Sequence, residues 1–537
     1  MITLSIKGMT CNSCTNHIKE AIEPIKGVRS VEVSYSEATA KIETIDDINR
    51  CEIIDAIEAL GYTVSELDSV KSKQLHVAII GSGSGAFASA IKAAEGGARV
   101  TIIEGADVIG GCCVNVGCVP SKILIRAAQL AHNQRSNPFD GLENSHPQIS
   151  RALLAHQQTA RVDELRGAKY QSILENNPAL TLLKGYARFE NKNTLLVRKP
   201  DGSEEKLIAD RILIATGSTP SIPAIKGLTD TPYWTSTEAL FAEELPDSLI
   251  VIGSSVIALE IAQAYARLGS HVTVLARHTL LYAEDPLLGE KLTECFEKED
   301  IRVLNNTQAS SVSYDGKSFS LDTNEGTLTA DKLLISTGRH ANTAQLGLEN
   351  VGVETQKDGA IVVNDKMETS TANIYAAGDC SNMPQFVYVA AAAGSRAGIN
   401  MTGGDARLDL STMPAVIFTD PQVATVGLTE EQAITGGFDV ISRVLDMENV
   451  PRALANFETD GFIKLVADKP TGKILGAQIL AHEGGELIQS AALAIHNNMT
   501  VDDLAGQLFP YLTMVEGLKL CAQTFSKDVK ELSCCAG

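Results

Sequence analysis

The chain has 537 residues, too many for one hydrophobic core, and its length suggests about three or four domains. Its net charge of -21 argues against nucleic acid or an anionic membrane as a partner, because their phosphates would be repelled. No apolar run approaches the roughly 20 residues of a membrane helix, and residues 1–7 lack the basic and apolar parts of a signal peptide. We therefore expect a cytoplasmic protein without membrane insertion.

The first 67 residues predict a separate small domain. Their hydrophobic pattern alternates between strand and helix periods in the order βαββαβ, which is the ferredoxin-like arrangement. Strands are predicted at 2–6, 28–33, 39–43 and 62–64, and helices at 16–22 and 48–60. Polar residues at 68–74 then predict a linker.

Seven of the chain's cysteines fall into three tight clusters, at 11 and 14, at 112, 113 and 118, and at 534 and 535. A secreted disulfide framework would spread its cysteines along a shorter chain, so clustering indicates thiol chemistry. Cys11 and Cys14 precede a helix, which favours the thiolate and leaves both sulfurs on a loop. A thioredoxin-type motif would need another fold and a zinc site a second pair nearby, so we predict a soft-metal site there. Cys51 is predicted to be a core residue.

A repeat follows, in which residues 76–81 correspond to 248–253 and residues 99–103 to 271–275. Each copy reads as a strand, a glycine-type turn, a helix and a second strand, which predicts two dinucleotide-binding units. The first turn is Gly81-x-Gly83-x-x-Ala86, and Glu104 ends the second strand, where a carboxylate can bind a ribose. We assign FAD to this unit because the redox cysteines lie within it. Thr216-Gly217 and Gly378-Asp379 also follow strands and are further candidate nucleotide loops.

The second turn is Gly253-x-Ser255-x-x-Ala258, and the position that corresponds to Glu104 is an alanine followed by Arg277. Loss of the carboxylate removes repulsion of a 2′-phosphate, and a guanidinium can bind that phosphate, which favours NADPH over NADH. The alternative is that Arg277 is an ordinary surface arginine.

The stretch from Gly110 to Lys122 carries a Cys-x4-Cys pair, Cys113 and Cys118. Because of this segment, the chain from residue 75 onward resembles the pyridine nucleotide–disulfide oxidoreductases. The resemblance implies a head-to-tail homodimer in which the two cysteines lie against the flavin, Lys122 lies near its N5 atom and Glu260 pairs with that lysine. It also implies that Asp379 binds the flavin ribitol. Family members usually have threonine where this chain has Cys112. The alternatives for this third thiol are that it takes no part in the reaction, that it forms a non-productive disulfide with its neighbour, or that it contacts the metal.

Disulfide-reducing members of the family carry a His-Pro-Thr near the C-terminus as acid–base. The matching stretch here, residues 509–516, has Tyr511 in place of the histidine, and no histidine follows His496. A phenol with a pKa of about 10 is a poor base at neutral pH, so disulfide reduction is disfavoured. Cys534 and Cys535 near the chain end can capture a two-coordinate soft ion.

These features resemble the mercury(II)-reducing members of the family, and that resemblance adds Tyr170 near the metal. It implies reduction of Hg(II) to Hg(0) by NADPH through FAD, for mercury detoxification. Cys11 and Cys14 would pass the ion to Cys534 and Cys535, and the tail and Tyr511 would serve the partner subunit's dithiol. The alternatives are an NADPH-dependent reductase of a small disulfide, a flavin enzyme with an incidental metal domain, and a metal-sequestering chaperone with a vestigial reductase.

The predicted fold class is α/β, with two Rossmann-like FAD/NAD(P)-binding domains and an α+β dimerisation domain behind a ferredoxin-like βαββαβ domain. The predicted boundaries are 1–67 for the metal-binding domain, 68–74 for the linker, 75–218 and 340–407 for the FAD domain, 219–339 for the NADPH domain, and 408–537 for the dimerisation domain with its cysteine tail.

Overall fold

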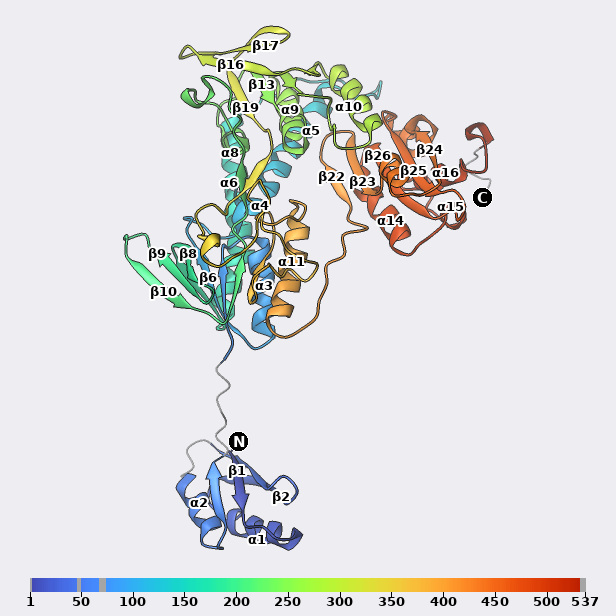
Figure 1. Ribbon diagram of the computed structural model, residues 1–537. Coiled ribbons are helices and arrows are strands. Elements are labelled where there is room, and N and C mark those ends of the chain that lie inside the picture. The colour runs from blue at the N-terminus through green and yellow to red at the C-terminus, as the bar shows by residue number, and fades with distance from the viewer. Residues whose placement is uncertain (1, 46–49, 67–73, 532–537) are drawn as a thin grey trace. The chain divides into compact units, whose positions relative to one another are not determined.

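The computed structural model describes residues 2–45, 50–66 and 74–531. Contacts between residues divide the chain into a small N-terminal unit and a large unit with most of the rest, and each is described by itself (Figure 1). Within the described ranges, no helix is both long enough and apolar enough to cross a membrane.

The N-terminal unit has the predicted βαββαβ order. Its elements are β1 (Ile2–Lys7), α1 (Asn12–Ile22), β2 (Val28–Ser34), β3 (Thr39–Thr44), α2 (Arg50–Glu58) and β4 (Thr63–Glu66). The antiparallel sheet has the order β2-β3-β1-β4, so the first strand lies in the middle. Ile18 and Ile22 of α1 and Ile53 and Ile57 of α2 are fully buried in the unit's core. This packing fixes where the loop between β1 and α1 emerges.

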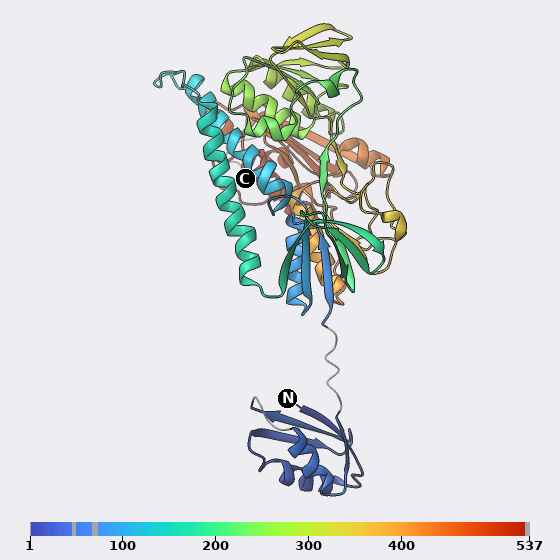
Figure 2. The same cartoon turned by 90° about the vertical axis from the view of Figure 1, so that its left-hand side faces the viewer.

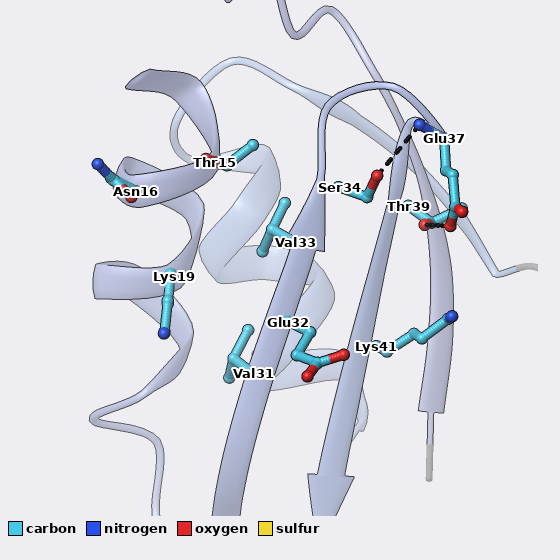
Figure 3. A pocket seen from close by; sticks show the side chains of 10 residues that line it. All are labelled: Thr15, Asn16, Lys19, Val31, Glu32, Val33, Ser34, Glu37, Thr39 and Lys41. Atoms are coloured by element: carbon cyan, nitrogen blue, oxygen red, sulfur yellow. Dashed lines mark hydrogen bonds between the residues drawn. The ribbon is translucent and has the colours of Figure 1, made fainter. Parts of the chain in front are cut away.

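A shallow hollow lies between α1 and the strands β2 and β3 of this unit (Figure 3). Its lining is mostly polar, with Lys19 from the helix and Glu32 and Lys41 from the strands. No cysteine contributes to the lining, so the hollow is separate from the thiol loop.

The first dinucleotide-binding unit is a parallel sheet with the order β21-β11-β5-β6-β7. Its strands are β5 (His76–Ile80), β6 (Arg99–Glu104), β7 (Leu180–Lys184), β11 (Arg211–Ile214) and β21 (Ile374–Ala376). Helix α3 (Ser84–Glu95) packs on α11 (Val387–Met401), and the two lie side by side in Figure 1. A Cβ on Gly394 would overlap the carbonyl of Gly85, so glycine permits this close contact.

The redox segment supplies the helices beside this sheet. These are α4 (Gly111–Val116), α5 (Cys118–Arg135), α6 (Arg151–Arg166), a π-helical turn (Gly167–Gln171) and α7 (Ser172–Asn176). Figure 2 shows the two long helices α5 and α6, drawn in blue to teal, beside each other. An antiparallel sheet, β8 (Tyr186–Asn191), β9 (Thr194–Arg198) and β10 (Glu204–Ile208), precedes β11, and a two-stranded ribbon joins β12 (Ser218–Pro220) to β20 (Arg339–Ala341).

The second dinucleotide-binding unit repeats the first. Its parallel sheet has the order β15-β14-β13-β19, with β13 (Ser248–Ile252), β14 (His271–Leu275), β15 (Arg302–Leu304) and β19 (Lys332–Ile335). Its helices are α8 (Ser236–Phe241), α9 (Val256–Leu268) and α10 (Pro286–Lys298), and a small antiparallel sheet is formed by β16 (Ala309–Tyr314), β17 (Phe319–Thr323) and β18 (Gly326–Ala330). Helix α9 is buried along most of its length, which accounts for its small and aliphatic sequence.

The C-terminal part is a five-stranded antiparallel sheet with the order β22-β23-β26-β25-β24. The strands are β22 (Ala415–Ile417), β23 (Gln422–Gly427), β24 (Val440–Asp446), β25 (Phe462–Asp468) and β26 (Ile474–Ala481). Its helices are α12 (Glu430–Thr435), α13 (Pro451–Asn456), α14 (Gly484–His496), α15 (Val501–Ala505) and α16 (Glu516–Gln523). Helix α15 ends before Gly506, a poor helix former. The predicted α/β class is confirmed.

Candidate active site and metal-binding loop

The cysteine pair sits where one short helix gives way to a long one. Cys113 lies in α4 and Cys118 is the first residue of α5. Gly110 and Gly111 enter α4 with φ of 102° and 67°, which glycine adopts without strain. A Cβ on Gly111 would lie 2.6 Å from Cα of Gly83. The start of α4 is therefore pressed against the first glycine turn, which brings the thiols to the proposed FAD site.

The two sulfurs differ in acidity. A hydrogen bond with Cys113, helped by the positive charge of Lys122, lowers the pKa of Cys118 to about 7 against the opposing effect of burial. The same hydrogen bond, together with burial, raises the pKa of Cys113. At neutral pH Cys118 is therefore ionised in a substantial fraction of molecules while Cys113 keeps its proton, and the thiolate is the form that binds soft metals.

Lys122 is fixed by contacts from two other parts of the large unit. Its Nζ donates to Oε2 of Glu260 on α9 at 2.7 Å and lies 4.4 Å from the ring centre of Phe418. Glu260 is 4% exposed, and its Oε1 accepts a hydrogen bond from the backbone N–H of Phe418 at 3.0 Å. The lysine one turn after Cys118 is thus held by the second dinucleotide unit and by the loop after β22.

Tyr170 lies in the π-helical turn that follows α6 and faces the start of α3. Its hydroxyl is 3.3 Å from Oγ of Ser84, and its ring meets Phe87 edge to face at 4.9 Å. A Cβ on Gly110 would be 3.3 Å from the Tyr170 ring. Burial raises the pKa of Tyr170, and charge on Cys113 or Cys118 adds to that rise, so the phenol stays protonated at the edge of the dithiol. From the sequence alone, Tyr170 looks like an ordinary aromatic residue on a helix surface. The π-helical turn that directs it toward α3 could not be predicted from the sequence.

Asn115 is a site residue that sequence reasoning missed. Its Nδ2 donates to the carbonyls of Ile109 and Gly111, both at 2.9 Å, and its Oδ1 accepts from Nη1 of Arg166 at 2.9 Å. The side chain therefore closes the turn before α4 and joins it to the end of α6. The only available signal was its place between the two cysteines.

Arg339 is a second residue that sequence reasoning missed. Its guanidinium donates to Oγ and O of Ser218 at 2.7 and 2.6 Å, and its Nη2 is 3.8 Å from Sγ of Cys112. The Ser218 hydroxyl donates to Asp379 at 3.0 Å. Burial raises the pKa of the Cys112 thiol, with Arg339 opposing the rise. Cys112 thus lies beside this polar cluster.

The first glycine turn suits an anionic dinucleotide such as FAD. Gly81 has φ of 107°, and a Cβ there would overlap the carbonyl of Ala215, so the turn requires glycine. Gly83 caps α3 without a side-chain hydrogen bond, which leaves the amides of this 12-residue helix to face a pyrophosphate. Ala86 is fully buried, and Glu104, at the end of β6, accepts hydrogen bonds from the Ser82 hydroxyl and from the N–H of Ala106. The residues therefore fit a flavin dinucleotide.

The two further candidate nucleotide loops follow β11 and β21. Gly217 and Gly378 adopt positive φ in these loops, next to Thr216 and Asp379.

The second turn fits a nicotinamide dinucleotide in the same way. Gly253 has φ of 136°, and a Cβ there would overlap the carbonyl of Ser336. Ser255 caps the 13-residue helix α9 without a side-chain hydrogen bond, and Ala258 is 1% exposed against the strands. Arg277 follows β14 by two residues. This leaves free helix amides and a cation at the carboxyl end of the sheet, where dinucleotides bind.

In the N-terminal unit, Cys11 and Cys14 point their sulfurs at each other across 3.9 Å. Cys11 is exposed, whereas Cys14 is 8% exposed and accepts a hydrogen bond from N–H of Thr10 at 3.5 Å. A hydrogen bond from Tyr62, with others from Thr10 and Cys11, lowers the pKa of Cys14 to about 6. Tyr35 donates to the carbonyl of Thr10 at 3.0 Å and fixes the loop. Only Cys11 therefore precedes the helix as predicted: Cys14 lies in the first turn of α1, so the pair offers one buried thiolate and one exposed sulfur.

Among the residues that the structure describes, no three or more His, Cys, Asp and Glu side chains gather as a metal site. Cys11 and Cys14 therefore have no third side chain of these types beside them in that part of the chain, and two sulfurs alone suit a soft ion better than zinc.

The C-terminal candidates lie away from α4 in the chain. Tyr511 is 57% exposed in the loop between α15 and α16, where Thr513 donates to the carbonyl of Pro510 at 2.8 Å. Glu516, which opens α16, is 5% exposed, and its Oε2 has no hydrogen-bond partner in the described part of the chain. Cys534 and Cys535 lie outside the described residues.

Comparison with known proteins shows which family the chain belongs to. Residues 75–394 match the pyridine nucleotide-disulphide oxidoreductase family. The chain belongs to this family. Residues 413–522 match the dimerisation domain of the pyridine nucleotide-disulphide oxidoreductases, and residues 3–63 match the heavy-metal-associated domain.

Relatives within the family are similar over the whole chain. A mercuric reductase of Shewanella putrefaciens is 72% identical and covers 100% of both chains, and one of Shigella flexneri is 56% identical with the same coverage. Among solved structures, the HOCl-induced flavoprotein disulfide reductase RclA of Escherichia coli has a TM-score of 0.75 at 28% identity, covering 84% of this chain and 100% of its own. LpdA of Mycobacterium tuberculosis has a TM-score of 0.75 at 29% identity with the same coverage.

Proposed function

We propose that this chain is an NADPH-dependent flavoenzyme that reduces Hg(II) to elemental mercury: NADPH + Hg²⁺ → NADP⁺ + H⁺ + Hg⁰. The observation that carries the proposal is the full-length similarity, 72% in identity, to a mercuric reductase. Tyr511 supports it, because a phenol stands where disulfide-reducing relatives need a histidine base. The heavy-metal-associated domain supports it as well, because soft ions bind sulfur.

At the dithiol, the chemistry supplied by bound FAD is the transfer of two electrons from NADPH to the metal. The Cys118 thiolate attacks Hg(II) held by two carrier thiolates and displaces the first of them. The Cys113 sulfur then displaces the second, which takes the Cys113 proton and leaves as a thiol, so that the ion is held by two cysteine sulfurs. Each exchange replaces one S–Hg bond with another, so no step has to break a strong bond without making one. Lys122, held by Glu260, keeps positive charge beside the Cys118 sulfur. Tyr170 bounds the site with a neutral phenol that can donate to a sulfur or contact the metal.

For delivery, Cys11 and Cys14 collect Hg(II) and pass it to Cys534 and Cys535. The match to the dimerisation domain supports a homodimer. Within the dimer, the cysteine tail and Tyr511 of one subunit act at the dithiol of the partner subunit, where the tail hands over Hg(II). The enzyme works in the cytoplasm, where NADPH is available and thiols stay reduced. We propose the domain boundaries given by the sequence, with the NADPH domain at 219–339 between the two parts of the FAD domain.

The test compares substrates with the FAD-loaded full-length protein. NADPH oxidation is followed with Hg(II) in excess thiol, and then with glutathione disulfide and with lipoamide. We expect turnover with Hg(II) and little with either disulfide. Turnover with a disulfide and none with Hg(II) would overturn the proposal in favour of a small-disulfide reductase.

A further inference from the structure

The loop after β14 carries an aromatic pair for which the sequence offered no role. The rings of His278 and Tyr282 lie 4.6 Å apart with an angle of 33° between their planes. Tyr282 is 67% exposed, although large aromatic side chains are usually mostly buried. One face of its ring is therefore covered by the imidazole, while most of the phenol faces solvent.

The exposure of Tyr282 is imposed by the loop that carries it. Its two preceding neighbours, Leu280 and Leu281, are 1% and 5% exposed and anchor the loop in the core of the large unit. Leu281 has φ of 51°, a left-handed conformation that is costly for leucine. The N–H of Asn306 donates to the carbonyl of His278 at 2.7 Å. The loop is thus fixed inward immediately before a tyrosine that it turns outward.

The same loop is fastened to the second glycine turn. The N–H of Leu281 donates to the carbonyl of Ser254 at 2.9 Å, and Ser254 is the middle residue of Gly253-x-Ser255. Arg277 directly precedes His278. The aromatic pair therefore lies at the carboxyl end of the parallel sheet, between the turn that faces a pyrophosphate and the cation proposed for the 2′-phosphate.

We propose that Tyr282 stacks on the adenine ring of NADPH, with His278 supporting it from behind. The inference rests on the proposed use of NADPH, whose adenosine half must lie at this end of the sheet. A purine has a large apolar face, and an aromatic ring that stacks on it removes that face from water. Because the loop already holds the Tyr282 ring in place, stacking costs little side-chain conformational entropy. Arg277 then binds the 2′-phosphate on the same adenosine, so that base and phosphate are recognised by neighbouring side chains.

The competing explanation is that Tyr282 merely stabilises the loop by packing on His278. The two explanations separate with ligands that do or do not contain adenine. Adenosine 2′,5′-bisphosphate carries the base and the 2′-phosphate, whereas reduced nicotinamide mononucleotide carries neither. A stacking residue affects only the first ligand, whereas a loop-stabilising residue changes the binding of both.

The experiment measures both dissociation constants by calorimetry with the FAD-loaded full-length protein. Variants are Tyr282→Ala, Tyr282→Phe and, as a matched control, Phe438→Ala, which removes an aromatic ring that is 42% exposed in the dimerisation domain. We expect Tyr282→Ala to weaken binding of adenosine 2′,5′-bisphosphate by roughly tenfold or more, and Tyr282→Phe by less than about threefold. Phe438→Ala should bind it as the wild type does.

Wild-type affinity in Tyr282→Ala, or an equal loss for reduced nicotinamide mononucleotide, would overturn the stacking role. A wild-type protein that binds neither NADPH nor adenosine 2′,5′-bisphosphate would instead overturn the proposed use of NADPH, and the stacking role with it.

Discussion

Arg166 donates a hydrogen bond of 2.9 Å to Asn115 and so ties the end of α6 to the helix that carries Cys113. Arg166 is followed at once by the π-turn of Tyr170, and Asn115 also holds the carbonyls of Ile109 and Gly111. The position of the dithiol and that of the tyrosine beside it are therefore linked by one side-chain contact.

Asn115→Ala should loosen this arrangement. It removes three part-buried hydrogen bonds, so we expect a loss of about 1–3 kcal/mol in stability. Turnover of thiol-bound Hg(II) should fall more than flavin reduction by NADPH, because only the former needs the dithiol geometry. Thermal unfolding and stopped-flow flavin absorbance measure the two effects. Equal losses in both reactions would contradict a positioning role.

Lys122→Met should make Cys118 less acidic. The main cause of the lowered pKa of Cys118, about 7, is the hydrogen bond with Cys113, and the charge of Lys122 adds to it. Without that charge the pKa rises, so alkylation of Cys118 by iodoacetamide should shift to higher pH. Lys122→Arg is the control because it keeps the charge. An unshifted alkylation curve in Lys122→Met would show that the lysine does not act on the thiolate.

Arg277→Ala should reduce the preference for NADPH over NADH. Loss of a charged hydrogen bond to the 2′-phosphate predicts roughly a tenfold to hundredfold rise in KM for NADPH with little change for NADH. Arg302→Ala is a matched control, since that arginine is exposed at the start of the neighbouring strand β15, whereas Arg277 follows the end of β14. An unchanged ratio of kcat/KM for the two coenzymes would leave Arg277 as an ordinary surface arginine.

His482 should make stability depend on pH. Its Nδ1 lies 3.4 Å from Asp420, which also pairs with Arg267 at 3.0 Å, and 3.7 Å from Glu458. The hydrogen bond with Asp420 raises the pKa of His482 against the effect of burial, and a nearby charge on Glu458 adds to the rise. A raised histidine pKa stabilises the fold below the unfolded value, and that stability is lost as pH rises through the folded pKa.

Melting temperatures of the wild type and of His482→Gln check this between about pH 6 and pH 9. The gap between the two proteins should be widest at the acidic end and close toward the alkaline end. A gap that is constant across the range would mean that the histidine acts by packing alone.

The sequence was enough to predict those parts of the site whose residues lie close together along the chain. The glycine turns at Gly81 and Gly253, the thiol pairs and the repeat of βαβ units all depend on residues a few positions apart. The contacts of Tyr170, Arg339 and Asn115 could not be predicted, because they depend on how distant segments pack. The π-turn that places Tyr170 beside Ser84, for example, leaves no mark in hydrophobic periodicity.

Release of mercury vapour tests the central claim most directly. The full-length FAD-loaded protein is given Hg(II), excess thiol and NADPH, and Hg(0) is measured in the gas phase together with NADPH consumed. We expect one Hg(0) per NADPH for the wild type, and none for the Cys113→Ala, Cys118→Ala double variant, with FAD still bound. Vapour release by the double variant at the wild-type rate, or NADPH consumption by the wild type without Hg(0), would contradict reduction at this dithiol.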